Sequence, residues 1–197
     1  RHGQVATVRS ILGDPTFAAV NLVDEYGRTA LMRAARYGHA ECVQLLLAAN
    51  AFANRADNEG DTALIYAAQD GHTECVRMLL AANASTEQVD SLGSTALCVA
   101  SDAGHADCVR LLLAANASFD HANTDQVTAL IWACEQGHAE CVRLLLAANA
   151  SVDLADPCGT SALLFASKNG HADCVRLLLA ANASVDHANT DQVTALI

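Results

Sequence analysis

Hydrophobic and polar positions alternate along this chain in a pattern that recurs every 33 residues. The clearest copy is Gly137–Ala150, in which Gly-His-Ala-Glu precedes Cys-Val, a Leu-Leu-Leu run and Ala-Ala-Asn-Ala. Apolar residues at this spacing indicate a short amphipathic helix. The Gly of the Gly-His pair stands at Gly38, Gly71, Gly104, Gly137 and Gly170. A fixed period of this length predicts stacked units, each of which buries its apolar face against its neighbours.

The period divides the chain into units that we expect to contain a turn and two helices. Full units are predicted at 24–56, 57–89, 90–122, 123–155 and 156–188. Residues 1–23 form a degenerate N-terminal half unit, with Gly3–Leu12 in place of the second helix, and 189–197 begin a further unit. The text from Gly104 to Ile131 returns from Gly170 to Ile197 with one change, Phe119 against Val185, which indicates duplication of a two-unit block.

Polar residues mark the ends of the predicted helices. A hydroxyl residue before each first helix is expected to accept a backbone N–H and so cap that helix. These residues are Thr29, Thr62, Thr95, Thr128, Ser161 and Thr194. An asparagine after each second helix is expected to adopt the left-handed conformation. These are Asn50, Asn83, Asn116, Asn149 and Asn182, and we favour this capping role over glycosylation of the Asn-Ala-Ser sequences.

Composition and charge narrow the class of partner. The chain is 52% hydrophobic but only 4% aromatic, which suits small side chains between closely packed helices. Its formal net charge of −11 makes a nucleic-acid partner unfavourable. No run of about 18 apolar residues predicts a membrane span. The chain opens at Arg1 without an apolar signal segment and stops at Ile197 inside an expected helix, so we expect a piece of a longer protein.

Eight cysteines raise the question of disulfides or metal sites. Five of them hold one repeat position, three residues after the histidine, as in His39-x-x-Cys42. Packed helices lie ~8–10 Å apart, too far for the Cα separation of ~4.4–6.8 Å that a disulfide needs, and His-Cys pairs so spaced do not converge on one zinc ion. We therefore expect core thiols, histidines in hydrogen bonds between units, no metal or cofactor, and a reducing compartment, the cytoplasm or alternatively the nucleus. Cys158, in a turn, is expected to be exposed.

These motifs resemble the ankyrin repeat. Thr62-Ala63-Leu64, Ala67-Ala68, Gly71-His72, Leu79-Leu80 and Asn83-Ala84 stand where that family has Thr-Pro-Leu-His, Ala-Ala, Gly-His, a Leu-Leu run and a Gly-Ala helix end. The resemblance implies an all-α ankyrin-repeat solenoid of stacked helix-turn-helix units with projecting β-hairpin-like turns. It also implies binding of other proteins through these turns and the concave helical face, without catalysis. Gln126 and Gln192 replace the turn glycine, which predicts a different turn type in those two units.

The positions that differ between units are the candidate binding residues. At ~100° per residue, Trp132 lies about 200° from Leu130 and so away from the core face of its helix. The same position in successive units holds Arg33, Tyr66, Val99, Trp132 and Phe165. We expect this row to be exposed and to contact a partner; cover by the neighbouring hairpin is the alternative. Turn and helix-end residues complete the predicted site: Tyr26, Tyr37, Glu59, Asp70, Leu92, Asp102, Glu135 and Lys168.

The residues that recur between units, and the catalytic motifs that are missing from the sequence, indicate the class of function. No nucleophile, base and orienting group recur as a set, and there is no phosphate-binding glycine loop, so we do not expect an enzyme. The sequence predicts a non-catalytic module that binds a protein partner, and the acidic middle units suit a partner with a basic segment. Two alternatives remain: a spacer or peripheral scaffold in a larger complex, contacting neighbours through Arg77, Arg110, Arg143 and Arg176, or the binding region of a larger enzyme or channel whose active part lies elsewhere.

Overall fold

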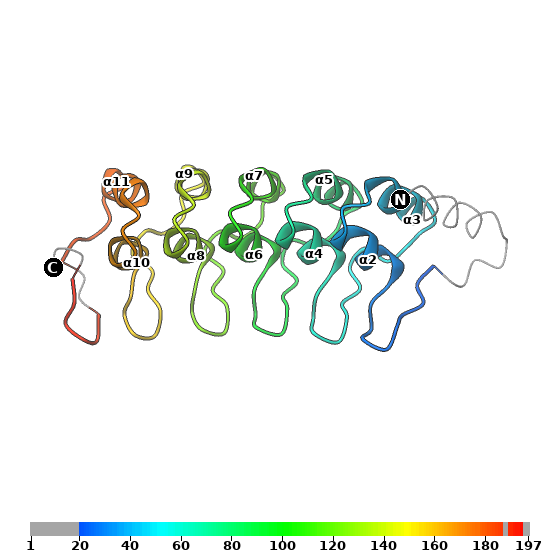
Figure 1. The fold of residues 1–197 in the computed structure, drawn as a ribbon, viewed down its shortest axis with the longest axis horizontal. Helices are drawn as coiled ribbons and strands as arrows, with labels where there is room; N and C mark the ends of the chain where they lie inside the picture. The colour runs from blue at the N-terminus through cyan, green and yellow to red at the C-terminus, as the bar shows by residue number, and fades with distance from the viewer. Residues whose placement is uncertain (1–19, 187–188, 195–197) are drawn as a thin grey trace.

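The computed structural model describes residues 20–186 and 189–194, which form an elongated stack of helix pairs (Figure 1). The first helices are α2 (Ala30–Arg36), α4 (Ala63–Gln69), α6 (Ala96–Asp102), α8 (Ala129–Glu135) and α10 (Ala162–Lys168). The second helices are α3 (Ala40–Ala48), α5 (Thr73–Ala81), α7 (Ala106–Ala114), α9 (Ala139–Ala147) and α11 (Ala172–Ala180). The half unit predicted around Gly3–Leu12 and the last three residues of the chain lie outside the described residues.

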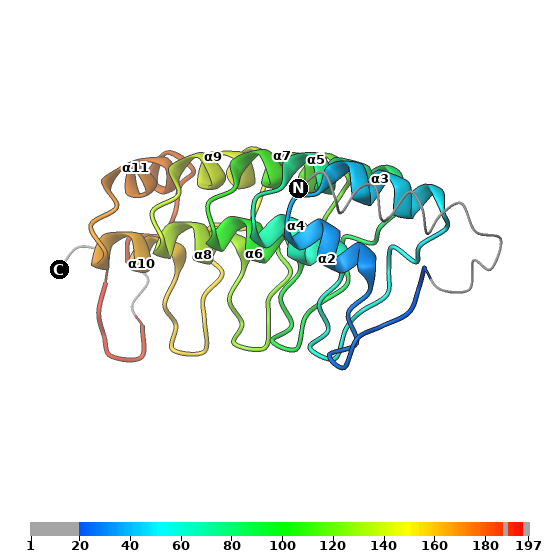
Figure 2. The ribbon, with the colours of Figure 1, turned by 45° about the vertical axis from the view of Figure 1, so that its right-hand side comes forward.

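The helices form two layers. Each first helix contacts the second helix of its own unit and the first helices of the units before and after it, and the second helices contact one another in the same way. The connecting segments between units project as hairpins from the row of first helices (Figure 2). Each hairpin closes with one antiparallel bridge, such as Ala56 with Thr62. The predicted all-α solenoid with projecting hairpin-like turns is therefore confirmed.

Adjacent hairpins are linked by backbone hydrogen bonds. Asn58 N–H donates to the Tyr26 carbonyl at 3.0 Å, and Ser91 N–H donates to the Glu59 carbonyl at 2.7 Å. Within a hairpin, the Asp57 carboxylate accepts from the backbone N–H groups of Glu59 and Asp61. This network fixes the direction of each hairpin relative to the next one.

The turns that lack glycine adopt the same conformation as those that have it. Gln126 has φ 61° and Gln192 φ 63°, close to φ 84° at Gly60. Asn123 accepts from the backbone N–H groups of Asp125 and Val127, as an aspartate does in other units. The prediction of a different turn type is wrong, because this side-chain network holds the left-handed residue at a cost of only about 1–2 kcal/mol.

Most of the predicted helix caps are present. Thr62 Oγ1 accepts from Ile65 N–H at 3.2 Å, and the threonine of the three other units has the same bond. Ser161 has the same extended backbone but makes no capping bond with its side chain. Serine lacks the γ-methyl group that restricts χ1 of threonine, so its hydroxyl is not held in the capping orientation. The predicted left-handed asparagines are confirmed, with φ between 60° and 66°.

The core lies between the two layers and continues from unit to unit. Its side chains are leucine, valine, alanine and cysteine, with Val43, Val76, Val109 and Val142 completely buried. All cysteines except Cys158 are buried and free. Burial raises the pKa of the Cys75 and Cys141 thiols to about 11, so both stay protonated at neutral pH. The cysteines are therefore apolar core residues, as their repeat position predicts.

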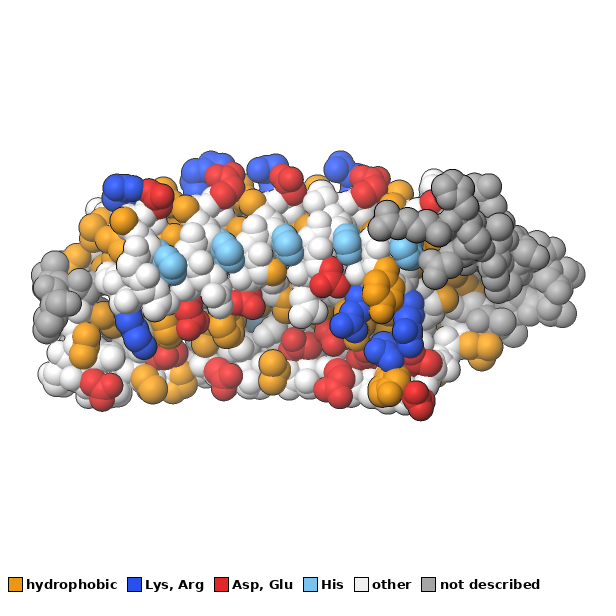
Figure 3. Space-filling model, viewed as in Figure 1, with side chains coloured by type: hydrophobic (Ala, Val, Ile, Leu, Met, Phe, Trp, Pro, Cys, Tyr) orange, Lys and Arg blue, Asp and Glu red, His pale blue; other side chains and the backbone are white. Residues whose placement is uncertain are grey.

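Histidine and glycine form a second contact between units. The His138 ring Nε2 donates to the Asp102 carbonyl at 2.9 Å, and His72 and His171 make the same bond to the preceding unit. The histidines form a row across the stack (Figure 3). Gly104, at φ +77°, leaves space for the His138 ring, because a Cβ on Gly104 would lie 2.6 Å from ring atoms. The predicted histidine hydrogen bonds are confirmed at His72, His138 and His171, and the glycine is needed for conformation and for space.

We predict that Gly104→Ala destabilises the protein more than Gly170→Ala. Gly170 has a similar φ, +75°, but a Cβ there meets nothing within 4 Å, so both substitutions strain the backbone and only one displaces a ring. We expect a cost of about 1 kcal/mol for the conformation and about 1–3 kcal/mol more for the collision. Urea unfolding measures both. Adding His138→Ala to Gly104→Ala should restore part of the loss; equal costs for the two glycine substitutions would contradict the assignment.

We also predict that one thiol of the eight reacts in the native protein. Cys158 is the exposed cysteine, whereas the other thiols are buried in the core. Titration with a chromogenic disulfide reagent should release about one equivalent quickly, and seven more only after denaturation. Cys158→Ser should abolish the fast phase while leaving the unfolding midpoint unchanged. A fast phase that persists in this variant would show that the core opens readily.

Candidate functional site

The predicted row of variable residues lies on the first helices, on the side of the hairpins. Its exposure is uneven: Arg33 is exposed, Val99, Trp132 and Phe165 are half-buried against the core, and Tyr66 is only 6% exposed. The expectation that the whole row is exposed is therefore wrong at Tyr66. The alternative, cover by a hairpin, describes this residue.

A hydrogen bond to the hairpin explains the burial of Tyr66. Its hydroxyl donates to Asp57 Oδ2 at 2.6 Å across nine residues of sequence. Burial, and then this bond, raise the pKa of the Tyr66 phenol, so the hydroxyl remains a donor. Tyr66 thus connects its helix to the hairpin of its own unit.

The same connection occurs one unit earlier with a different pair of residues. Arg33 Nη2 donates to Asp24 Oδ2 at 2.6 Å, also across nine residues. The hydrogen bond from Arg33 keeps the pKa of the Asp24 carboxyl well below its usual range. Asp24 and Asp57 were not among the residues predicted from the sequence. The recurring spacing of nine residues from a hairpin aspartate to a donor in the row is a sequence signal that identifies both.

Basic and aromatic side chains gather on the unit formed by residues 24–56. We call Tyr26, Arg28, Arg33, Arg36 and Tyr37 the arginine–tyrosine patch. The Arg28 guanidinium lies 4.2 Å from the centre of the Tyr26 ring. Figure 3 shows this patch as blue and orange side chains close to the right-hand end of the stack. No comparable group of cations is visible over the middle units on this face.

The remaining predicted residues are distributed along the stack. Glu59, Asp70, Leu92 and Lys168 are exposed. Asp102 and Glu135, at the ends of their helices, are half-buried, and their carbonyls accept the histidine bonds from the next unit. The predicted residues therefore do not converge on one cavity. They form an extended surface along the hairpins and the first helices.

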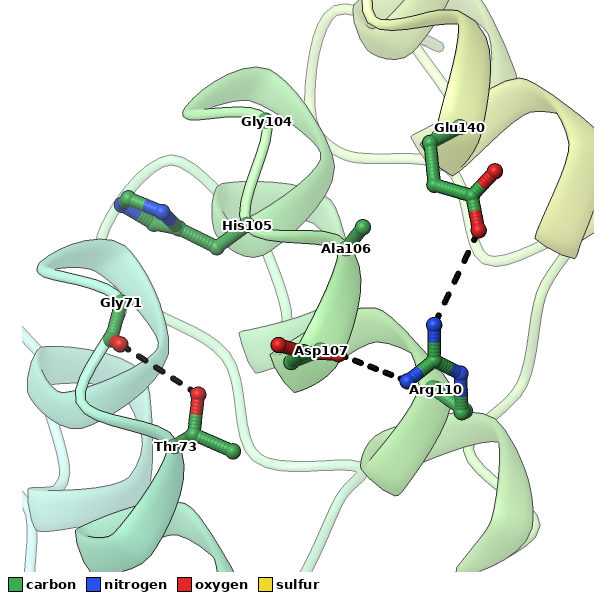
Figure 4. A pocket seen from close by; sticks show the side chains of 8 residues that line it. All are labelled: Gly71, Thr73, Gly104, His105, Ala106, Asp107, Arg110 and Glu140. Atoms are coloured by element: carbon green, nitrogen blue, oxygen red, sulfur yellow. Dashed lines mark hydrogen bonds and ion pairs between the residues drawn. The ribbon is translucent and has the colours of Figure 1, made fainter.

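A shallow hollow of about 380 Å³ lies elsewhere, beside the second helices (Figure 4). The Arg110 guanidinium contacts Asp107 at 2.6 Å and Glu140 at 3.7 Å, so these charges are already paired. The His105 side chain points away from them. The hollow brings together no set of nucleophile, base and orienting group, and within residues 20–186 and 189–194 no three His, Cys, Asp or Glu side chains are placed to hold a metal ion.

Comparison with known proteins agrees with this architecture. The family model described as ankyrin repeats in three copies matches residues 1–90 and 82–156, and the single ankyrin repeat model matches 158–190. A crystal structure of an ankyrin repeat domain from Acinetobacter baumannii superimposes with a TM-score of 0.84 and 33% identity, covering 93% of this chain and 95% of that chain. No curated protein sequence matches.

The matches also place general limits on function. Ankyrin repeats are generally modules for protein–protein interaction and are generally not catalytic. Over the described part of the chain, every helix is too short or too polar to cross a bilayer. The family models cover well over half of the sequence, and they agree with the 33-residue period, the helix pairs and the hairpins. The chain belongs to the ankyrin repeat family.

Proposed function

We propose that this chain is a non-catalytic module that binds a protein partner along the face made by its hairpins and first helices. The proposal rests on one observation: residues that differ between units and large exposed apolar side chains occur together on this face. Tyr26, Tyr37 and Leu92 are 54%, 59% and 61% exposed on this face. Large side chains that water reaches in a folded protein are typical of binding surfaces.

The fold lets these residues vary without affecting the stack. Most core positions hold the same or a similar apolar residue in every unit, with one buried position of the first helix varying among Met, Ile, Cys and Leu. The proposed contact positions vary in charge and polarity as well, and they lie at the hairpins or only partly against the core. The proposed contact residues are Tyr26, Arg33, Tyr37, Glu59, Asp70, Leu92, Val99, Asp102, Trp132, Glu135, Phe165 and Lys168. Tyr66 is not among the proposed contact residues, because its hydroxyl binds Asp57 and so positions the hairpin.

The opposite side of the stack supports a partner less well. Arg77, Arg110, Arg143 and Arg176 each contact an acidic residue three positions earlier. Exposed pairs of this kind satisfy their own charges and contribute about 0–1 kcal/mol. We therefore place the partner on the hairpin side. The buried free thiols suit the reducing conditions of the cytoplasm or nucleus.

The middle units favour a partner segment with basic residues. Asp61 is half-buried next to the carboxylates of Asp57 and Asp90, and burial followed by these two charges raises its pKa to about 6. A carboxylate kept in such a place costs folding stability at neutral pH. A cation from a partner would relieve the repulsion.

To test the proposed surface, we would compare Leu92→Ala/Trp132→Ala with Phe52→Ala. Phe52 is also 61% exposed but follows the second helix and lies outside the proposed surface. Cross-linking and mass spectrometry of proteins captured by the unmodified chain would identify the partner set. We expect the double variant to lose these partners by at least about tenfold and Phe52→Ala to retain them. Circular dichroism checks folding; equal capture by all three folded proteins would contradict the proposal.

We further predict that Asp61→Asn stabilises the protein in a pH-dependent way. The folded pKa, about 6, exceeds the ordinary value of 3.8. The Asp61 carboxyl therefore has no effect on stability below about pH 4. Its cost develops as the pH rises from the ordinary pKa to the folded pKa of about 6, and it is complete above that value. After allowance for its partial exposure, the gain should be about 1 kcal/mol at pH 8 and near zero at pH 4. Urea unfolding at both pH values measures this gain in stability. An equal gain at pH 4 and pH 8 would show that the raised pKa of Asp61 is not its cause.

A further inference from the structure

The arginine–tyrosine patch differs from the rest of the surface in its positive charge, and this charge indicates which kind of partner segment binds there. This step rests on the proposed function. We propose that the patch receives the carboxylates of an acidic segment of the partner protein. Arg33 and Arg36 would bind these carboxylates, with Tyr26 and Tyr37 on either side.

Net charge sets unit 24–56 apart from its neighbours. It contains four arginines against three carboxylates, those of Asp24, Glu25 and Glu41. The next unit, 57–89, contains Arg77 against six carboxylates. The other full units, 90–122, 123–155 and 156–188, are net negative as well, so unit 24–56 is the one full unit with a positive net charge. It lies at one end of the surface on which we place the partner (Figure 3).

The other units show that the fold does not need these arginines. The position of Arg28 is occupied by Asp61, Ser94, Val127 and Thr160 in the units that follow. The position of Arg36 is occupied by Gln69, Asp102, Glu135 and Lys168. Each of these units forms the same helix pair and the same hairpin. Four internal comparisons therefore separate the patch from the requirements of folding.

The patch has more guanidinium donors than its own carboxylates use. Arg28 and Arg33 both contact one oxygen, Asp24 Oδ2, at 3.2 and 2.6 Å. The Arg33 side chain remains 48% exposed, and besides Asp24 it also interacts with Tyr37 of the same patch. A guanidinium has five donors in a planar arrangement that matches a carboxylate. Asp24 therefore positions Arg33 while leaving donors for a second carboxylate.

Arg36 makes no ion-pair contact within 4.0 Å in the described part of the chain, although its charge acts on the Asp61 carboxyl of the next unit and opposes the rise in the pKa of that group that burial causes. Its guanidinium instead lies 5.1 Å from the centre of the Tyr66 ring, which is held by the bond to Asp57. Arg36 follows Arg33 by three residues on α2, so the two side chains share one side of the helix. The ladder arginines on the second helices differ, because each already contacts its own acidic residue.

The surroundings favour an acidic protein segment over a nucleic acid. A polynucleotide carries a charge on every phosphate, and it would extend from the patch over the carboxylates of unit 57–89. A short acidic peptide segment needs to contact only the patch. At physiological salt, charges beyond about 8 Å are screened, so the negative charge of the distant units repels the segment only weakly.

The direct test measures binding of a fluorescein-labelled alternating Gly-Glu peptide by fluorescence anisotropy at physiological salt. We expect saturable binding to the unmodified chain, and binding about tenfold weaker to Arg33→Gln/Arg36→Gln. The matched control, Arg110→Gln/Arg143→Gln, removes the same charge from the ladder and should bind as the unmodified chain does. Arg36→Gln alone leaves the Asp24 contacts intact and should lose part of the affinity.

Several results would overturn the proposal. These are absence of saturable Gly-Glu binding, equal loss in the ladder control, or binding of oligothymidylate as tight as that of the Gly-Glu peptide. Circular dichroism of each variant separates loss of binding from loss of folding. Partner capture by Leu92→Ala/Trp132→Ala tests the wider surface independently. If the Gly-Glu peptide does not bind the patch but Leu92→Ala/Trp132→Ala loses the partners, the acidic segment is rejected and the proposed function stands.

Discussion

Burial of apolar surface between neighbouring units is the interaction on which the rest of this structure depends. The first helices have seven residues and the second helices nine, too few for stability in isolation. Each helix contributes leucine, valine, alanine or cysteine to a core that continues through the stack. Because no unit has a closed core of its own, stability is a property of the junctions between units.

The junctions leave one side of the stack free for function. Histidine rings and hairpin backbones make polar contacts between units. Side chains that differ from unit to unit add others, as where Thr124 donates to the Leu92 carbonyl and Gln136 donates to Asp102. The side chains of Arg33, Val99 and Trp132 take no part in these hydrogen bonds between units. An arginine, a valine or a tryptophan is therefore accommodated at the same position of successive units without a change in the path of the backbone.

The fold was predictable because it depends on residues that repeat. The 33-residue period, the threonine caps and the left-handed asparagines each gave a physical expectation that the structure matches. Two local predictions failed, one because side-chain hydrogen bonds are present and one because a side-chain hydrogen bond is missing. Asn123 accepts from the backbone on both sides of Gln126 and so holds it in a conformation that glycine normally adopts. Ser161 does not make the predicted capping bond to its helix.

The candidate site was less predictable, because it depends on residues that do not repeat. The helical angle correctly separated Trp132 from Leu130, which is completely buried, but the same angle did not reveal that Asp57 binds the Tyr66 hydroxyl. Such a contact spans a hairpin whose shape the periodicity does not specify. The exposure of each residue in the row thus depends on whether its side chain binds a residue of the hairpin.

The contact of glycine with histidine has a consequence for how the array changes length. Gly104 accommodates His138 from the following unit. The sequences of 104–131 and 170–197, which differ only at Phe119 and Val185, carry the same half of each junction. Recombination between two such copies at any matching codon adds or removes whole periods and creates no junction that the protein did not already contain. The gene is therefore free to gain or lose recognition surface in steps of two periods, the 66 residues that separate the starts of the two copies, with folding unaffected at the point of exchange.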